Sequence, residues 1–193
     1  SVPLDLPGTY MLLVRNVRFM KDIARFLRES GQLYSDKAGA SVKPAQISTL
    51  RAWEAYWKYG VKLSATDELR IKAATGLDVK DVPKASWLEV FTLWSPEDRE
   101  YIDRIDKAYP VFEGVEPIFH IATIHTVKGG EADNVVLLLS MSQLTHASYV
   151  TSPDPEHRAF YVGATRAKKN LCIVYGDHPT SYDIYPPDIK DAQ

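Results

Sequence analysis

The residues of this chain that could handle a phosphate group gather in one polar segment, residues 123–131 (TIHTVKGGE). Gly129 and the glycine after it let backbone N–H groups approach an anion closely, because no Cβ blocks the way. Lys128 adds positive charge, while Thr123 and His125 add hydrogen-bond donors suited to sugar-phosphate contacts. The segment therefore predicts an anion-binding loop, with a plain Gly-Gly turn between two strands as the alternative.

Two arginines could stabilise the charge that develops on a γ-phosphate during nucleotide hydrolysis, since a guanidinium is planar and always charged. Arg166 lies in a helix-forming segment, residues 155–169, and Arg15 directly follows an apolar run, residues 9–14. Arg158 lies eight residues before Arg166, so at about 100° per residue the two share a side of a helix without being in line. The alternative role for an arginine on such a helix is a surface salt bridge.

The chain lacks other catalytic signatures. No GxxxxGK[ST] phosphate loop occurs, and that motif supplies the β/γ-phosphate cradle and the Mg²⁺-binding hydroxyl. The one Asp-Glu pair, Asp67-Glu68, belongs to a helix-opening capping box and is a poor Walker B candidate. His120 and His125 are spaced like half a zinc site, but no cysteine pair accompanies them. We therefore expect no metal site and no Ser/His/Asp hydrolase in this chain.

Three short apolar runs surround the candidate residues, at 118–124, 134–139 and 171–175. Runs of this length are typical of buried strands, and the first is rich in β-branched residues. A helix over residues 155–169 separates the second run from the third, and strands alternating with a helix predict a parallel α/β sheet. Because such sheets bind ligands at the carboxyl ends of their strands, we expect the loop of residues 125–131 to lie there.

The predicted elements divide the chain into four stretches. Residues 1–43 form the first part of the sheet domain, 44–110 a helical insertion, 111–177 the second part of the sheet domain, and 178–193 a proline-containing tail. The insertion carries four tryptophans whose spacing with other apolar residues favours core packing over base stacking on DNA. They are Trp53, Trp57, Trp87 and Trp94.

The composition is that of a globular protein without a membrane segment. Of the 193 residues, 45% are hydrophobic and 25% are charged, which provides the core of one domain with a small insertion. A net charge of −2 argues against a histone-like polyanion binder. No apolar run reaches the ~18 residues of a membrane span and the start lacks a signal peptide, so we expect a cytoplasmic protein. Cys172 permits no internal disulfide and is expected in the core.

Residues 123–131 and 161–167 resemble the fifth and sixth motifs of superfamily 1 DNA helicases of the UvrD/Rep type, in the right order and each ahead of an apolar strand. The resemblance implies a second RecA-like domain, with a parallel sheet flanked by helices and a reduced helical insertion. Arg166 matches the family's arginine finger. Arg15 and Asn16 resemble the fourth motif, whose arginine reaches the γ-phosphate of bound nucleotide.

The same resemblance assigns ligands to the polar loop. Thr123 and His125, with the charge of Lys128 beside them, would contact single-stranded DNA. Glu131 would hold the ribose of ATP, and Gly129 would lie close to the nucleotide.

We therefore expect the C-terminal motor domain of an ATP-dependent DNA helicase or translocase, of the kind that acts in DNA repair. ATP and Mg²⁺ would bind in a cleft closed by a missing N-terminal RecA-like domain of the same polypeptide, which would carry the phosphate loop and the Mg²⁺ ligands. The isolated chain is then expected to be inactive. Two alternatives stay open: a stand-alone nucleic-acid-binding or partner-docking module, and the motor part of a helicase–nuclease.

Overall fold

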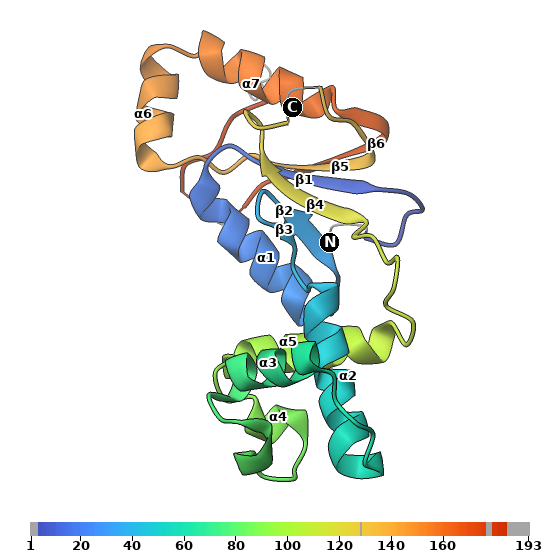
Figure 1. The fold of residues 1–193 in the computed structure, drawn as a ribbon. Helices are drawn as coiled ribbons and strands as arrows, with labels where there is room; N and C mark the ends of the chain where they lie inside the picture. Colours follow the sequence, from blue (N-terminus) through green and yellow to red (C-terminus); the bar gives the residue numbers. More distant parts are fainter. Residues whose placement is uncertain (1–3, 128, 177–178, 185–193) are drawn as a thin grey trace. The chain divides into compact units, whose positions relative to one another are not determined.

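The computed structural model of this protein describes residues 4–127, 129–176 and 179–184, and its ribbon is drawn in Figure 1. The chain forms two compact units. The α/β unit comprises the chain up to Leu27, the segment Tyr34–Gly39 and the chain from Pro117 onward, and the helical unit comprises Arg28–Leu33 and Ala40–Glu116.

Strands and helices alternate over much of the chain. The strands are β1 (Tyr10–Val14), β2 (Tyr34–Asp36), β3 (Gly39–Ala40), β4 (Phe119–Thr123), β5 (Ala132–Leu138) and β6 (Ala167–Val174). The helices are α1 (Met20–Glu29), α2 (Pro44–Tyr59), α3 (Ala65–Thr75), α4 (Trp87–Val90), α5 (Pro96–Ala108), α6 (Gln143–Thr151) and α7 (Asp154–Ala164), with 3-10 turns η1 (Val17–Phe19) and η2 (Val79–Asp81).

The strands form one six-stranded sheet in the order β3-β2-β4-β1-β5-β6. β1 lies between β4 and β5, parallel to both, with Tyr10 opposite Phe119 and Asn134. All five residues of β1 are buried, as expected of a parallel strand covered on both faces. β2 pairs with β4 and β6 with β5, also in parallel. The predicted fold class, a parallel α/β sheet flanked by helices as in RecA-like domains, is confirmed.

Two edges of this sheet matter for the site. The carboxyl edge is the end at which β1 and β4 stop, at Val14 and its register partner Thr123. The amino edge is the end at which β5 and β6 start, at Ala132 and its register partner Ala167. Since β4 and β5 run parallel, residues 124–131 must travel from the carboxyl edge to the amino edge. The expectation that this whole loop lies at the carboxyl ends is therefore wrong, because only its start does.

Helices cover both faces of the sheet, with α7 on one face and α1 on the other (Figure 1). α7 approaches the sheet closely at Gly163, where a Cβ would meet Leu137 Cδ1 at 3.1 Å and Ile124 Cγ1 at 3.4 Å. Phe160 of α7 stacks on Tyr182, with ring centroids 4.1 Å apart, in the same core. The glycine at position 163 is thus what allows α7 to lie so near β5.

The predicted helix over residues 155–169 is too long. α7 stops at Ala164, a turn contains Arg166, and β6 already begins at Ala167. The two lysines that follow Ala167 are good helix formers, which is why the sequence pattern favoured helix there. Pairing with β5 overrides that local preference, as tertiary contacts commonly do in strands.

The helical unit has an aromatic core of its own. Trp53 is fully buried and donates its indole N–H to a backbone carbonyl at 2.9 Å. Phe91 packs against both Trp53 and Trp87, with ring centroids 6.5 and 6.1 Å away. Trp53 and Trp87 are 0% and 4% exposed, so the predicted core packing holds for them. Trp57 and Trp94 are half-buried.

Helix boundaries in this unit follow the sequence signals. Ser64 Oγ accepts a hydrogen bond from the Asp67 N–H at 3.1 Å, as in a capping box, and opens α3. α3 ends at Gly76, whose φ of 79° is left-handed and suits a residue without a Cβ. Asp67 therefore completes the capping box that the sequence predicted for it.

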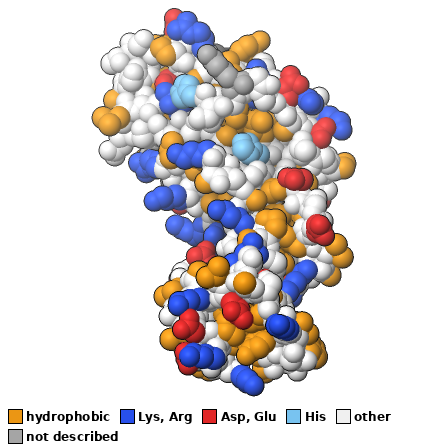
Figure 2. Space-filling model, in the orientation of Figure 1, with side chains coloured by type: hydrophobic (Ala, Val, Ile, Leu, Met, Phe, Trp, Pro, Cys, Tyr) orange, Lys and Arg blue, Asp and Glu red, His pale blue; other side chains and the backbone are white. Residues whose placement is uncertain are grey.

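The side of the helical unit drawn in Figure 2 carries charges of both signs. On the side drawn in Figure 2, Lys and Arg side chains are interspersed with Asp and Glu over this unit. Within the described part of the chain, we find no helix with the length and apolar character required to span a bilayer. Cys172 is half-buried rather than in the core, because its strand β6 has a sheet neighbour on one side.

Candidate functional site

Arg166 lies at the amino edge, in the turn that joins α7 to β6. Its carbonyl accepts a hydrogen bond from the Ala132 N–H at 3.1 Å, which ties this turn to the start of β5. Its guanidinium donates through Nε to the Val162 carbonyl at 3.0 Å and through Nη1 to the Gly130 carbonyl at 3.4 Å. A third contact joins Nη2 to the Thr165 hydroxyl at 3.3 Å. Among the described residues, the hydrogen-bond partners of the guanidinium are thus neutral oxygens. Because none of these partners neutralises its positive charge, the half-exposed guanidinium can still bind an anion.

The loop beside Arg166 is shaped by its glycines. Gly129 has a φ of 80°, and a Cβ there would meet nothing within 4 Å, so backbone conformation rather than space explains this glycine. The Gly130 N–H donates to the Val127 carbonyl at 3.0 Å and closes the turn. This N–H is therefore engaged within the loop instead of facing an anion. Lys128, predicted to contact DNA, lies outside the described residues.

Glu131 ends the loop one residue after the carbonyl that meets Arg166. Its side chain is 54% exposed and lies 3.6 Å from Lys168 Nζ. Next to it, Asp133 is bound by Lys169 Nζ at 2.9 Å and by the Thr9 N–H at 3.0 Å. These two contacts, with that of Lys169 the stronger, hold the pKa of the Asp133 carboxyl below its ordinary value. The amino edge thus carries an exposed carboxylate at Glu131, a half-buried one at Asp133, and the exposed amines of Lys168 and Lys169.

Thr123 and His125 lie at the carboxyl edge. The Thr123 side chain is buried, and its hydroxyl donates to Thr126 Oγ1 at 3.2 Å. The Thr126 N–H and hydroxyl both donate to the Thr123 carbonyl at 3.0 Å, which makes a tight turn directly after β4. His125 sits in that turn and is exposed. The turn therefore presents the imidazole to solvent, while Thr123 shapes the backbone beneath it.

Arg15 also lies at the carboxyl edge, directly after β1, and it is occupied by another side chain. Its Nε and Nη2 donate to the two carboxylate oxygens of Glu156 at 2.6 and 2.8 Å. The next residue, Asn16, accepts from the Ser142 N–H at 2.8 Å and donates to Thr145 Oγ1 at 2.9 Å. Both residues after β1 thus bind the beginnings of helices, α7 and α6.

The structure therefore separates the predicted nucleotide contacts. Arg166 and the loop that leads to Glu131 lie together at the amino edge. Arg15 lies with His125 at the opposite edge, because β1, β4, β5 and β6 run in one direction. Arg15 follows the end of β1, whereas Arg166 precedes the start of β6.

Glu156 is the residue near this site that sequence reasoning missed. It is 5% exposed, which is rare for a carboxylate. One signal was available, because Glu156 precedes Ala159, Phe160 and Gly163 by three, four and seven positions. That spacing puts all four residues on one side of a helix, so an apolar stripe containing a glutamate indicates a buried partner.

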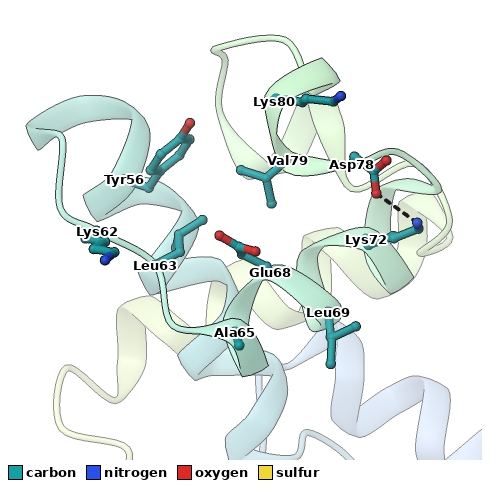
Figure 3. A pocket seen from close by; sticks show the side chains of 10 residues that line it. All are labelled: Tyr56, Lys62, Leu63, Ala65, Glu68, Leu69, Lys72, Asp78, Val79 and Lys80. Atoms are coloured by element: carbon teal, nitrogen blue, oxygen red, sulfur yellow. Dashed lines mark hydrogen bonds and ion pairs between the residues drawn. The ribbon is translucent and has the colours of Figure 1, made fainter.

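Among the described residues, neither a metal site nor the groove in the helical unit includes these side chains. In the described ranges, no three His, Cys, Asp or Glu side chains gather where they could hold a metal ion. The helical unit has a groove of about 740 Å³ between α2, α3 and η2 (Figure 3). A Lys72–Asp78 ion pair at 2.8 Å, drawn there as a dashed line, satisfies two of the charges at its border.

Comparison with known proteins identifies the segment that holds Arg166, Glu131 and His125. The model of the UvrD-like helicase C-terminal domain matches residues 112–178, about a third of the chain. No curated protein matches the chain. The matched segment contains β4, β5, α7 and β6, and hence both predicted helicase motifs. Residues 112–178 of this chain are thus similar to the UvrD-like helicase C-terminal domain.

Proposed function

We propose that this chain is the C-terminal motor domain of an ATP-dependent DNA helicase, with the nucleotide at the amino edge of the sheet and single-stranded DNA at the carboxyl edge. The observation that carries this proposal is the position of Arg166, half-exposed and 3.4 Å from the carbonyl that precedes Glu131. This geometry supports one nucleotide site shared by an arginine and a carboxylate from the matched segment.

The chemistry of the amino edge suits a nucleoside triphosphate. A guanidinium held by backbone carbonyls can face a γ-phosphate without first breaking an ion pair, and its fixed charge stabilises the charge that builds up during transfer. The exposed carboxylate of Glu131 can accept hydrogen bonds from ribose hydroxyls. Lys168, 3.6 Å from Glu131, would give up a weak exposed contact when ribose binds.

At the carboxyl edge, His125 is the residue suited to DNA. Its exposed imidazole lies within a turn that Thr123 and Thr126 fix by hydrogen bonds, so it can meet a sugar-phosphate backbone at little cost in entropy. Direct DNA contacts by Thr123 and Lys128 stay predictions. So does a phosphate contact by Arg15, for which Glu156 is a competing partner.

The remaining parts of the site would come from a partner domain. The phosphate loop, the Mg²⁺ ligands and the residue that positions water are expected on an N-terminal RecA-like domain, because this sequence contains no GxxxxGK[ST] motif. ATP would then bind between that domain and the amino edge. The cytoplasmic location and the role in DNA repair remain expectations.

The test is to assay ATP hydrolysis by the 193-residue chain alone and after adding an N-terminal motor fragment that carries a phosphate loop. We expect no turnover from the chain alone and DNA-stimulated turnover from the mixture, lost in Arg166→Ala. Arg25→Ala is the matched control, since Arg25 is an exposed arginine of the same unit with a side chain 69% exposed. Mg²⁺-dependent turnover by the chain alone would contradict the proposal. A mixture that does not respond to Arg166→Ala would favour a binding or docking module instead.

A further inference from the structure

We infer that Arg15 is a positioning residue, which anchors the start of α7 through Glu156 and thereby sets the place of Arg166 at the other end of that helix. This role differs from the phosphate contact predicted for Arg15. The ion pair stands whatever the chain's ligands are, and only the meaning of Arg166 rests on the proposed function.

The geometry of the pair is that of a structural contact. Arg15 Nε and Nη2 meet both oxygens of Glu156 at 2.6 and 2.8 Å, a two-pronged arrangement that fixes both side chains. The side chains are 19% and 7% exposed, so solvent screens the pair weakly. If Arg15 turned to a phosphate, Glu156 would be left as a buried charge without its partner, which is strongly unfavourable.

A second contact shows that the turn after β1 holds two helices. Asn16 binds the Ser142 N–H at 2.8 Å and Thr145 Oγ1 at 2.9 Å, both at the start of α6. Arg15 and Asn16 are consecutive, so one short turn at the carboxyl edge fixes the starts of both helices between β5 and β6.

α7 connects the anchored Glu156 at the carboxyl edge to the Arg166 turn at the amino edge. Glu156 lies in its first turn and Arg166 two residues after its end, and an eleven-residue helix is about 16 Å long. Gly163 lets the later part of α7 approach Leu137 and Ile124 so closely that the helix has little freedom to tilt. A displacement of the first turn is therefore passed to the Arg166 turn instead of being absorbed within the helix.

The experiment compares Glu156→Gln, Arg15→Lys and the double variant in the 193-residue chain, without nucleotide. We measure amide hydrogen exchange over residues 157–160 and the NMR resonance of the Arg166 Nε–H, which donates to Val162. Each single variant should speed exchange about tenfold or more and shift the Nε–H signal, and the double variant should match the singles because they break one contact. Asp106→Asn removes a comparable ion pair, Arg51–Asp106 with N–O 2.7 Å, in the helical unit and should change neither signal.

Several outcomes would overturn the inference. An unchanged Arg166 signal in both single variants, with only a lower melting temperature, would make the pair a stabiliser and not a positioning contact. Additive effects in the double variant would mean that Arg15 and Glu156 act separately. Because these readouts involve no ATP, their failure leaves the helicase proposal untouched, and failure of the ATPase assay above leaves this result standing.

Discussion

The two edges of the sheet use charge in opposite ways. At the amino edge, the Glu131 and Lys168 side chains are 54% and 55% exposed and 3.6 Å apart. At the carboxyl edge, the Arg15 and Glu156 side chains are 19% and 7% exposed and bound through both carboxylate oxygens. An exposed, loose pair can exchange its partner for a ligand at little cost, whereas a buried pair resists exchange. We therefore propose ligand binding for the first pair and positioning for the second.

Two segments join these edges, and both lie within residues 112–178, which match the family model. Residues 124–131 run from the turn with His125 to Glu131, and α7 runs from Glu156 to the Arg166 turn. Each edge is therefore linked to the other by a short covalent path, which would let a change at one edge reach the other.

The largest expected effect is on ATP hydrolysis, which should depend on residues of the amino edge far more than on His125 at the carboxyl edge. In the reconstituted motor, Arg166→Ala should lower kcat for ATP about 10³-fold, the lower end of what an arginine finger contributes. Glu131→Ala should raise the KM for ATP about tenfold, as loss of a hydrogen bond to a charged group does. Steady-state kinetics at saturating DNA measure both. Equal losses from His125→Ala would abolish the distinction between the edges.

A change inside α7 tests the tight packing between the edges. Gly163→Val should lower the free energy of unfolding by about 1–3 kcal/mol, because the new side chain would overlap Leu137 and Ile124. Urea unfolding followed by circular dichroism measures the loss. Ala147→Val is the control, a similar enlargement at an exposed site of α6, and should cost about 0.5 kcal/mol. Equal costs for the two variants would show that α7 is loosely packed.

DNA binding should depend on the carboxyl edge alone. His125→Ala should weaken binding of a single-stranded oligonucleotide by the 193-residue chain about threefold to tenfold, the loss of one hydrogen bond. His120→Ala, at the opposite end of β4, should leave the affinity unchanged. Fluorescence anisotropy at fixed salt measures both. A larger loss from Arg166→Ala than from His125→Ala would place DNA at the amino edge.

The smallest expected effect is the acid sensitivity of the amino edge. Lys169 and the Thr9 N–H lower the pKa of Asp133 below 3.8, so their stabilisation is present above that pH and is lost as the pH falls through the lowered pKa. Asp133→Asn should therefore be less stable than the parent at pH 6 and equal to it at about pH 2. Thermal unfolding across this range checks the convergence. A constant difference would show that Asp133 acts through its shape and not its charge.

Local patterns in the sequence were sufficient for much of the fold. The continuous apolar run of β5, the capping box at Ser64 and the glycine after α3 each predicted their element, because strand burial and helix capping depend on neighbours in sequence. The helix predicted through Lys169 failed where β6 pairs with β5, since pairing partners are distant in the chain. The motif containing Arg166 could be identified from the sequence because its residues are consecutive.

The sequence alone predicted a parallel α/β sheet, and its two motifs indicated a UvrD-like helicase C-terminal domain, whose family model matches residues 112–178. Only the tertiary structure decided which charges meet. Arg15 and Glu156 are 141 positions apart, and no spacing rule connects them. Likewise, β4 and β5 run in the same direction, so the loop between them starts at one edge of the sheet and ends at the other. His125 and Glu131 are six residues apart but lie at opposite edges. Propensity and periodicity act over a few residues, whereas the partner of a buried charge is fixed by the packing of whole elements.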